Sequence, residues 1–177
     1  KQGSKQAIQK WKALGIKNAV MFTGDNQTTA NQISKELELD KCYSELLPQN
    51  KVELLEDILK EKNTGKVIFV GDGINDAPVL ARADIGIAMG GIGSDAAIEA
   101  ADVVIMNDDI SKIEDGIVIA RNTNKIVNQN IIFALGVKAV VLILGAMGIA
   151  TMWLAVFADV GVALIAILNS MRRKIAK

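Results

Sequence analysis

The feature that most constrains the fold of this 177-residue chain is the uneven distribution of its charges. Between Ile131 and Ser170 the only charged residues are Lys138 and Asp159, whereas Lys, Arg, Glu and Asp are frequent earlier in the chain. A helix of about 20 apolar residues is long enough to cross the hydrocarbon core of a bilayer. The chain therefore divides near Asn130 into a polar, globular part and a membrane-compatible part.

Two apolar segments follow one another in the membrane-compatible part, at residues 131–150 and at about 153–171. The linker between them, around Thr151, carries no charge. Basic residues flank the pair on both outer sides: Arg121 and Lys125 before it, and Arg172, Arg173, Lys174 and Lys177 after it. Because cytoplasmic loops are enriched in Lys and Arg, we expect both outer ends in the cytoplasm and a helical hairpin with a very short outer turn. A soluble helical hairpin in a large core is the alternative.

The polar part alternates short apolar runs with segments of helical periodicity. The expected strands are residues 19–22, 67–70, 85–89 and 103–106, and the expected helices are residues 4–14, 27–39, 50–62 and 94–101. Strands that alternate with helices predict an α/β fold with a parallel sheet, whose buried strands are continuously apolar. In such sheets, ligands bind beyond the carboxyl ends of the strands.

Composition narrows the possible functions. The formal net charge is zero, so no global field favours a nucleic-acid partner. The chain has one cysteine, Cys42, and no histidine, so neither a disulfide framework nor a Cys/His zinc site can be built from this chain alone. Its first residue is Lys1, and no signal-peptide pattern follows, which predicts a fragment whose front is missing.

The strongest motif is the run from Gly71 to Leu80, GDGINDAPVL, which follows the expected strand at residues 67–70. Asp72 and Asp76 lie four residues apart and can face one site just past a buried strand. Two close carboxylates repel each other unless a cation lies nearby, and acidic oxygens are the ligands that a hard Mg²⁺ ion needs. The flanking glycines permit a tight backbone close to a ligand. The run therefore predicts a magnesium site.

Two weaker motifs lie earlier in the chain. The sequence Thr23-Gly24-Asp25-Asn26 closes the first expected strand, and a hydroxyl with free backbone N–H groups at a helix start is suited to bind an anion. The same residues also make a good turn and helix cap. Lys51 lies in the first turn of a helix, where a cation is slightly unfavourable for the helix dipole, which suggests a partner anion. An ordinary surface lysine is the alternative.

Taken together, in this order on successive strand ends, the three motifs resemble the haloacid-dehalogenase-type phosphotransferase domain, and specifically that of the P-type ATPases. Thr23-Gly24-Asp25, Lys51 and Gly71–Asp76 match the motifs of that family residue by residue. The segment Gly90–Asp102 resembles a later segment of the same family, so the resemblance covers essentially the whole chain.

The resemblance implies a fold and a domain organisation. The fold is a partial, Rossmann-like haloacid-dehalogenase-type phosphorylation domain followed by a two-helix transmembrane hairpin. Residues 1–109 would form the phosphorylation domain, residues 110–130 a helical stalk, and residues 131–177 the hairpin with a basic cytoplasmic tail.

The implied activity is phosphoryl transfer, in which an aspartate nucleophile takes the γ-phosphoryl group of ATP and water later hydrolyses the aspartyl-phosphate. The resemblance implies that Asp72 ligates Mg²⁺ and that Asp76 orients the loop and the waters of the metal. The residues of this chain would form the electrostatic cage around the transferred group.

The remaining site residues implied by the resemblance surround the phosphoryl group. Lys51 would neutralise its charge, Thr23 and Gly24 would hold its oxygens, and Asn75 would hydrogen-bond to it. Asp25 belongs to the same catalytic set without a defined role.

One departure from the family pattern is that the Asp-Lys-Thr-Gly-Thr motif, which holds the nucleophile, is absent from this chain. The nucleotide-binding domain, the dephosphorylation domain and the earlier membrane helices of the family are missing as well. The chain by itself should therefore not hydrolyse ATP. Without its first strand, the sheet should have an open gap or edge.

The two intramembrane charges need an explanation, because a charge inside a bilayer costs several kcal/mol. With Thr151 at the middle of the outer turn, Asp159 lies about 12 Å below it and Lys138 about 20 Å below it. The gap of about 8 Å is within reach of a lysine, so the two could pair across the hairpin. In a simpler interpretation, Asp159 lies near the outer interface and Lys138 extends toward water.

The segment Phe157–Leu164 resembles the last helix of P-type ATPases that export zinc, cadmium and lead. The resemblance implies that Asp159 binds the transported cation and that Lys138 is its built-in counter-charge. Copper exporters carry Tyr-Asn in the first helix and Met-x-x-Ser-Ser in the second, and neither string occurs here. The Cys-Pro-Cys ligands of the group would lie in the missing helices, so this chain holds half a site.

The leading hypothesis is a fragment of an ATP-driven pump, with Mg²⁺ and ATP as cofactors, that exports Zn²⁺, Cd²⁺ or Pb²⁺. Its partners would be the metal ion, the lipid bilayer and the missing N-terminal domains of the same protein, with no nucleic acid. The protein would be a multi-pass membrane protein of the bacterial plasma membrane, with its phosphorylation domain in the cytoplasm. The alternatives are a soluble phosphatase, a membrane-tethered module that binds phosphate or Mg²⁺ without catalysis, and a copper-type P-type ATPase.

Overall fold

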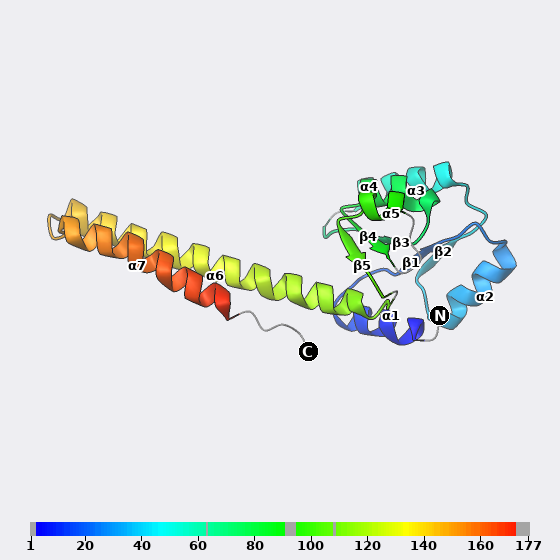
Figure 1. Ribbon diagram of the computed structural model, residues 1–177, viewed down its shortest axis with the longest axis horizontal. Coiled ribbons are helices and arrows are strands. Elements are labelled where there is room, and N and C mark those ends of the chain that lie inside the picture. The colour runs from blue at the N-terminus through cyan, green and yellow to red at the C-terminus, as the bar shows by residue number, and fades with distance from the viewer. Residues whose placement is uncertain (1–2, 63, 91–94, 108, 173–177) are drawn as a thin grey trace. The chain divides into compact units, whose positions relative to one another are not determined.

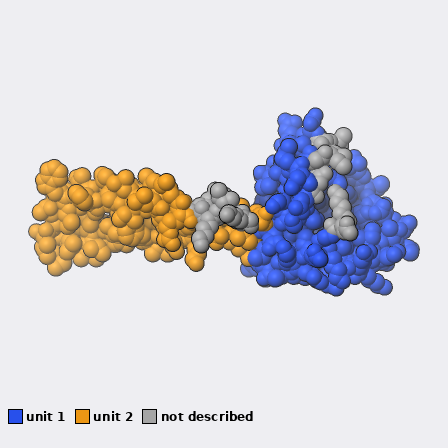
Figure 2. Space-filling view, turned by 60° about the horizontal axis from the view of Figure 1, so that its bottom comes forward, with its two compact units in different colours: residues 1–114 blue, residues 115–177 orange. Residues whose placement is uncertain are grey.

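The computed structural model describes residues 3–62, 64–90, 95–107 and 109–172. The chain separates into two compact units, residues 1–114 and residues 115–177 (Figure 2). Several residues considered in the sequence lie outside the described ranges: Lys1, Gly91 to Ser94, Arg173, Lys174 and Lys177.

The first unit alternates strands and helices, as the sequence predicts (Figure 1). Its helices are α1 (Ser4–Ala13), α2 (Gln27–Leu37), α3 (Pro48–Glu61), α4 (Ala77–Arg82) and α5 (Asp95–Ala100), with a 3-10 turn, η1 (Ile74–Asp76), before α4. Its strands are β1 (Val20–Phe22), β2 (Lys41–Tyr43), β3 (Ile68–Gly71), β4 (Ile85–Met89) and β5 (Val103–Ile105). The expected strands and helices are all confirmed with small differences at their ends, whereas β2, η1 and α4 are additional to the prediction.

All of the strand pairs are parallel, but they form two sheets rather than one. β1 pairs with β2, and β4 lies between β3 and β5. The ring centroids of Phe22 in β1 and Phe69 in β3 are 6.0 Å apart, so the two sheets adjoin. The open gap that the sequence predicts is therefore found where β1 and β3 lie near each other without pairing.

Helices cover both faces of the strands, with α3, α4 and α5 on one side and α1 and α2 on the other (Figure 1). The core includes the buried residues Leu80, Ala88 and Ala97. At Gly86, helix α4 approaches strand β4 so closely that a Cβ atom would lie 2.5 Å from the carbonyl oxygen of Leu80. Only glycine therefore allows α4 to pack in this position, because the obstructing atom belongs to the backbone.

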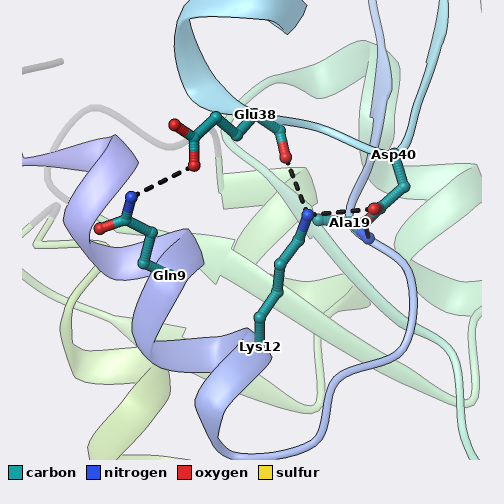
Figure 3. A network of polar contacts seen from close by, with 5 residues as sticks. All are labelled: Gln9, Lys12, Ala19, Glu38 and Asp40. Carbon is teal, nitrogen blue, oxygen red and sulfur yellow. Dashed lines mark hydrogen bonds and ion pairs between the residues drawn. The ribbon is translucent and has the colours of Figure 1, made fainter.

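An aspartate immediately before β2 ties the amino ends of β1 and β2 together (Figure 3). The backbone N–H of Ala19 donates to Oδ2 of Asp40 at 2.7 Å, and Nζ of Lys12 lies 3.0 Å from Oδ1. Lys12 also donates to the carbonyl oxygen of Glu38 at 2.8 Å. The Ala19 N–H and the Lys12 ammonium lower the pKa of Asp40, so this carboxylate stays ionised and bound.

The same arrangement occurs at the amino ends of the other strands. Asp84, just before β4, accepts a 2.8 Å hydrogen bond from the N–H of Val67 and pairs with Lys62 and Lys66. The Lys62 ammonium is the main cause that lowers the pKa of Asp84 to about 2, with the Val67 N–H next. Asp102, just before β5, accepts from the N–H of Gly86 at 2.8 Å. In each case, the aspartate before one strand binds the backbone near the start of its neighbour.

Two long helices dominate the second unit, α6 (Lys112–Ala146), which starts in the first unit, and α7 (Met152–Met171). The expected stalk and first membrane segment are thus one continuous helix. Both helices are long and apolar enough to cross a membrane. Just after the end of α6, Gly148 has a φ of 74°, and the N–H of Ile149 donates to the carbonyl oxygen of Leu144 at 2.9 Å. Thr151 caps α7 by accepting from the N–H of Leu154.

Candidate functional site

The loop after β1 holds the first set of expected site residues. Oγ1 of Thr23 donates to Oδ2 of Asp25 at 2.8 Å and accepts from the N–H of Asp25 at 3.1 Å. The N–H of Leu46 donates to the carbonyl oxygen of Thr23 at 3.1 Å, which joins this loop to the segment before α3. Gly24 and Asp25 are exposed at the tip of the loop. The backbone of the loop is therefore fixed by the segment before α3, while the tip of the loop remains exposed.

Lys51 reaches this region from the first turn of α3, as the sequence predicts. The start of α3 is fixed by the side-chain oxygen of Asn50, which accepts from the N–H of Leu47 at 3.2 Å. Nζ of Lys51 lies 2.8 Å from Oδ1 of Asp76, and only 16% and 13% of the two side chains are exposed. This shielded ion pair connects the helix to the loop after β3.

Gly71 explains how Asp76 comes to lie so close to the end of β3. A Cβ atom on Gly71 would lie 2.8 Å from Cβ of Asp76, which is closer than side chains tolerate. The loop therefore folds back over a bare backbone. Pro78 near the start of α4 suits this turn, because its fixed φ and missing N–H are tolerated in the first helical turn.

The two loops lie at the same end of the parallel strands, since both follow carboxyl ends and Phe22 contacts Phe69 between β1 and β3. Asp72 and Asn75 are exposed at this end. The structure thus brings together two pairs of expected site residues, Thr23 with Asp25 and Lys51 with Asp76.

The donor set can be compared with what different metals require. Among the described residues, no group of three or more His, Cys, Asp and Glu side chains could hold a metal ion. Asp72 and Asp76 provide carboxylates alone. Mg²⁺ usually keeps several waters and takes one or two protein carboxylates together with phosphate oxygens. The chemistry of Asp72 and Asp76 therefore fits Mg²⁺ at a phosphate-binding site.

The second candidate site lies between the two apolar helices. Nζ of Lys138 on α6 lies 3.5 Å from Oδ1 of Asp159 on α7. The pairing across the hairpin that the sequence allows is therefore present. Both side chains remain exposed on the isolated hairpin, at 62% and 73%. Within the described residues, Asp159 is paired with Lys138 and most of its side chain is exposed.

A polar cluster at the open end of the hairpin was not predicted from the sequence. Asn130 of α6 contacts Ala166, Asn169 and Ser170 of α7 through hydrogen bonds of 2.8 to 3.1 Å. The available signal was that Asn130 and Asn169 each lie at the end of an apolar segment, where an amide needs a partner.

Comparisons with known proteins agree with this geometry. A family model for haloacid dehalogenase-like hydrolases matches residues 1–84. The chain is 59% identical, over 97% of its length, to a cadmium, zinc and cobalt-transporting ATPase of Bacillus subtilis (strain 168), of which it covers 25%. It is 55% identical, again over 97% of its length, to a zinc-transporting ATPase of Synechocystis sp., of which it covers 24%.

A solved structure extends the likeness to three dimensions. The crystal structure of a zinc-transporting PIB-type ATPase in the E2.Pi state matches 97% of this chain with a TM-score of 0.90 and 38% identity, and the chain covers 28% of it. The match includes both the α/β unit and the two apolar helices, because it spans nearly all residues.

The fold and the two strand-end loops define a haloacid-dehalogenase-like domain with two long apolar helices at its carboxyl end. More narrowly, nearly the whole chain is similar to a part of heavy-metal-transporting P-type ATPases, and it spans about a quarter of the length of the relatives it matches. The resemblance recognised in the sequence is thereby confirmed.

Proposed function

We propose that this chain works as part of an ATP-driven pump that exports Zn²⁺, Cd²⁺ or Pb²⁺ through an aspartyl-phosphate intermediate. One observation carries the proposal: a single chain joins the Lys51–Asp76 loop site to a hairpin in which Lys138 and Asp159 lie 3.5 Å apart. A phosphatase domain alone has no use for a charged pair on two apolar helices, whereas a cation pump requires one.

At the loop site, the residues of this chain stabilise the phosphoryl group rather than attack it. Lys51 contributes positive charge, Thr23 and Gly24 bind phosphoryl oxygens, and Asn75 donates a hydrogen bond. Thr23 supports this role because its contact with Asp25 fixes its hydroxyl at the carboxyl end of β1. The Thr23 hydroxyl donates its one hydrogen to Asp25, so it must turn from that carboxylate to donate to a phosphoryl oxygen.

Asp72 and Asp76 would hold Mg²⁺, which when bound neutralises charge on the phosphoryl oxygens. Asp76 is held in place by Lys51 on one side and by the bare backbone of Gly71 on the other. Asp72 is exposed at the end of β3 and is free to turn toward a ligand. Asp76 is therefore oriented by the protein, whereas Asp72 is available to a ligand that approaches from the solvent.

The nucleophilic aspartate would come from a segment of the pump outside this chain. The gap between β1 and β3 supports this idea, because the unpaired N–H and C=O groups of a strand edge can pair with a further strand. A strand that filled the gap in parallel would end beside Thr23 and Asp72. Its first residue beyond the strand would then meet the phosphoryl cage described above.

In the hairpin, Asp159 would ligate the transported cation and Lys138 would replace the cation after release. The pair keeps the carboxylate neutralised when no metal is present, which lowers the cost of a lone charge in an apolar environment. A metal ion that binds Asp159 must displace the lysine, and the lysine returns when the ion departs. Both ends of the hairpin, with the phosphorylation domain, would face the cytoplasm of a bacterial plasma membrane.

Two other functions remain as outcomes of the test. A membrane-tethered module that binds phosphate or Mg²⁺ would form no phosphoenzyme, and a copper-type pump would respond to Cu⁺. The experiment uses the complete pump polypeptide in lipid vesicles and measures ATP hydrolysis stimulated by Zn²⁺, Cd²⁺, Pb²⁺ or Cu⁺.

We expect stimulation by the divalent ions, and its abolition by Asp159→Ala. The matched control is Asp57→Ala, which removes a carboxylate from an exposed ion pair on α3 and should leave stimulation intact. Zn²⁺-stimulated turnover that survives in the Asp159→Ala protein would rule out Asp159 as a ligand.

A further inference from the structure

The open end of the hairpin carries a reciprocal set of hydrogen bonds between α6 and α7. Nδ2 of Asn130 donates to the carbonyl oxygen of Ala166 at 3.1 Å and lies 3.0 Å from Oγ of Ser170. Nδ2 of Asn169 donates in return to Oδ1 of Asn130 at 2.8 Å. Oδ1 of Asn169 accepts from Nη1 of Arg172 at 3.3 Å. We call Asn130, Asn169 and Ser170 the amide clamp.

The amide clamp fixes direction as well as proximity. A hydrophobic contact between two apolar helices can slide with little penalty, because one methyl group replaces another. An amide whose oxygen and nitrogen both have partners cannot slide without breaking those hydrogen bonds. The clamp therefore selects one register of α7 against α6.

The Lys138–Asp159 pair lies in the register that the clamp selects. Lys138 comes eight residues after Asn130, a rise of about 12 Å along α6. Asp159 comes seven residues before Ala166 and ten before Asn169, a rise of about 10 to 15 Å along α7 in the opposite chain direction. The distances from the clamp to the ion pair along the two helices are therefore similar, at about 12 Å on α6 and about 10 to 15 Å on α7.

A shift of one residue would disturb that match. It would move Asp159 by about 1.5 Å along the helix axis and turn it by about 100° around the axis. In the observed register Nζ of Lys138 lies 3.5 Å from Oδ1 of Asp159, and the rotation would turn that carboxylate toward another face of α7.

We propose that Asn130 and Asn169 are positioning residues that set the register in which Lys138 meets Asp159, and hence the affinity of the pump for its cation. The inference rests on the proposed function of Asp159 as a ligand. The clamp residues are not ligands of the same ion, because they lie about 12 Å from the pair along the helices and their amides are occupied by each other.

The first test measures the metal dependence of the complete pump. Asn130→Ala, Asn169→Ala and the double variant should each raise the Zn²⁺ concentration for half-maximal ATPase activity by at least about 5-fold, which corresponds to a coupling of about 1 kcal/mol. The double variant should be no worse than the poorer single variant, because both remove the same interaction. Asn128→Ala is the matched control, an exposed asparagine on the same helix, and should leave the half-maximal concentration unchanged.

The second test measures the register in this chain, reconstituted in lipid nanodiscs. Spin labels are attached at Ile132 and Leu168, which are exposed on α6 and α7 near the clamp, after Cys42→Ser removes the native cysteine. The unaltered clamp should give one narrow distance distribution, and Asn130→Ala should broaden or shift it.

The outcomes separate the clamp from the proposed function. A loss of active protein with an unchanged half-maximal Zn²⁺ concentration would show a merely structural role and overturn the inference. An altered Zn²⁺ dependence with an unchanged distance distribution would also overturn it, because the asparagines would then act without setting the register. If Asp159→Ala retains the normal Zn²⁺ dependence while the clamp variants change the distances, the proposed function fails and the register role of the clamp stands.

Discussion

The two ends of the parallel strands use aspartate in opposite ways. At the amino ends, Asp40 and Asp84 accept backbone N–H groups and pair with lysines, and their pKa values are lowered by those contacts. At the carboxyl ends, Asp72 is exposed on its loop, and Asp76 is bound by one lysine that the proposed mechanism also assigns to the phosphoryl group. The same side chain thus serves the fold at one end and the proposed chemistry at the other.

The difference shows what distinguishes a structural carboxylate from a functional one. A carboxylate that bridges two strands through backbone N–H groups has its oxygens committed, and its removal leaves those N–H groups unpaired. A carboxylate beyond the carboxyl end has no ladder to hold and can take a ligand. Removing aspartates at one end should therefore cost stability, and removing them at the other should cost activity.

The largest expected effect is a loss of activity when an aspartate at the carboxyl ends of the strands is replaced. Asp72→Asn in the complete pump should reduce phosphoenzyme formation from ATP by on the order of 100-fold or more, because it removes a negative ligand of Mg²⁺. Acid-quenched incorporation of labelled phosphate measures this. The free energy of unfolding of the chain should change by less than about 0.5 kcal/mol, since Asp72 is exposed. Normal phosphoenzyme levels would remove Asp72 from the proposed site.

The next effect concerns the amino ends. Asp84→Ala should lower the free energy of unfolding by about 2 kcal/mol, because Val67 loses its acceptor and Lys62 loses its partner. Urea unfolding in detergent micelles, followed by the fluorescence of Trp11 in a Trp153→Phe background, measures the change. Asp57→Ala, which breaks an exposed pair on α3, is the control and should change the free energy by less than about 0.5 kcal/mol.

The pH dependence of stability should report the same contact without removing the side chain. The folded pKa of Asp84 is lowered to about 2 from the ordinary value of 3.8, so its ionised form stabilises the fold above about pH 4. That contribution should disappear as the pH falls from about 4 toward 2, where the folded carboxylate takes up a proton. The difference in unfolding free energy between the native chain and Asp84→Asn should therefore shrink over this range. A constant difference would show that Asp84 does not titrate in this contact.

The smallest expected effect is a loss of stability, and it ranks two aspartates at the amino ends of the strands. Asp40→Ala should cost about 1 kcal/mol, less than Asp84→Ala, because 34% of the Asp40 side chain is exposed and water can replace part of what Ala19 loses. The same urea titration measures it. A cost larger than that of Asp84→Ala would mean that exposure does not rank these contacts.

Much of the fold follows from local patterns in the sequence. The runs at β3, β4 and β5 are continuously apolar, as buried parallel strands require, and Gly15 ends α1 with a φ of 86°. β2 is harder to predict because its three residues, Lys41–Tyr43, have no strong apolar signal, and it is held by pairing with β1. Helix α4 is masked in the sequence by Pro78, which a helix accepts only in its first turn.

The candidate site likewise has residues that the sequence predicts and contacts that it does not. The residues of the Gly71–Asp76 loop can be recognised from the sequence, because their spacing is local. The contact between Lys51 and Asp76 joins residues 25 positions apart, and the amide clamp joins residues up to 40 apart, so both depend on tertiary packing. The Lys138–Asp159 pair could be predicted from the sequence, because two helices joined by a short turn fix which residues lie at the same height.

The turn between α6 and α7 has a consequence for how the protein is made. Its residues, from Met147 to Thr151, carry no charge, and the N–H groups of Met147, Gly148, Ile149 and Ala150 all donate to carbonyl oxygens of α6. A hairpin tip whose N–H groups already have acceptors can cross the hydrocarbon layer during biosynthesis without exposing those donors to lipid. The two helices can therefore enter the bilayer together, as one folded insertion unit.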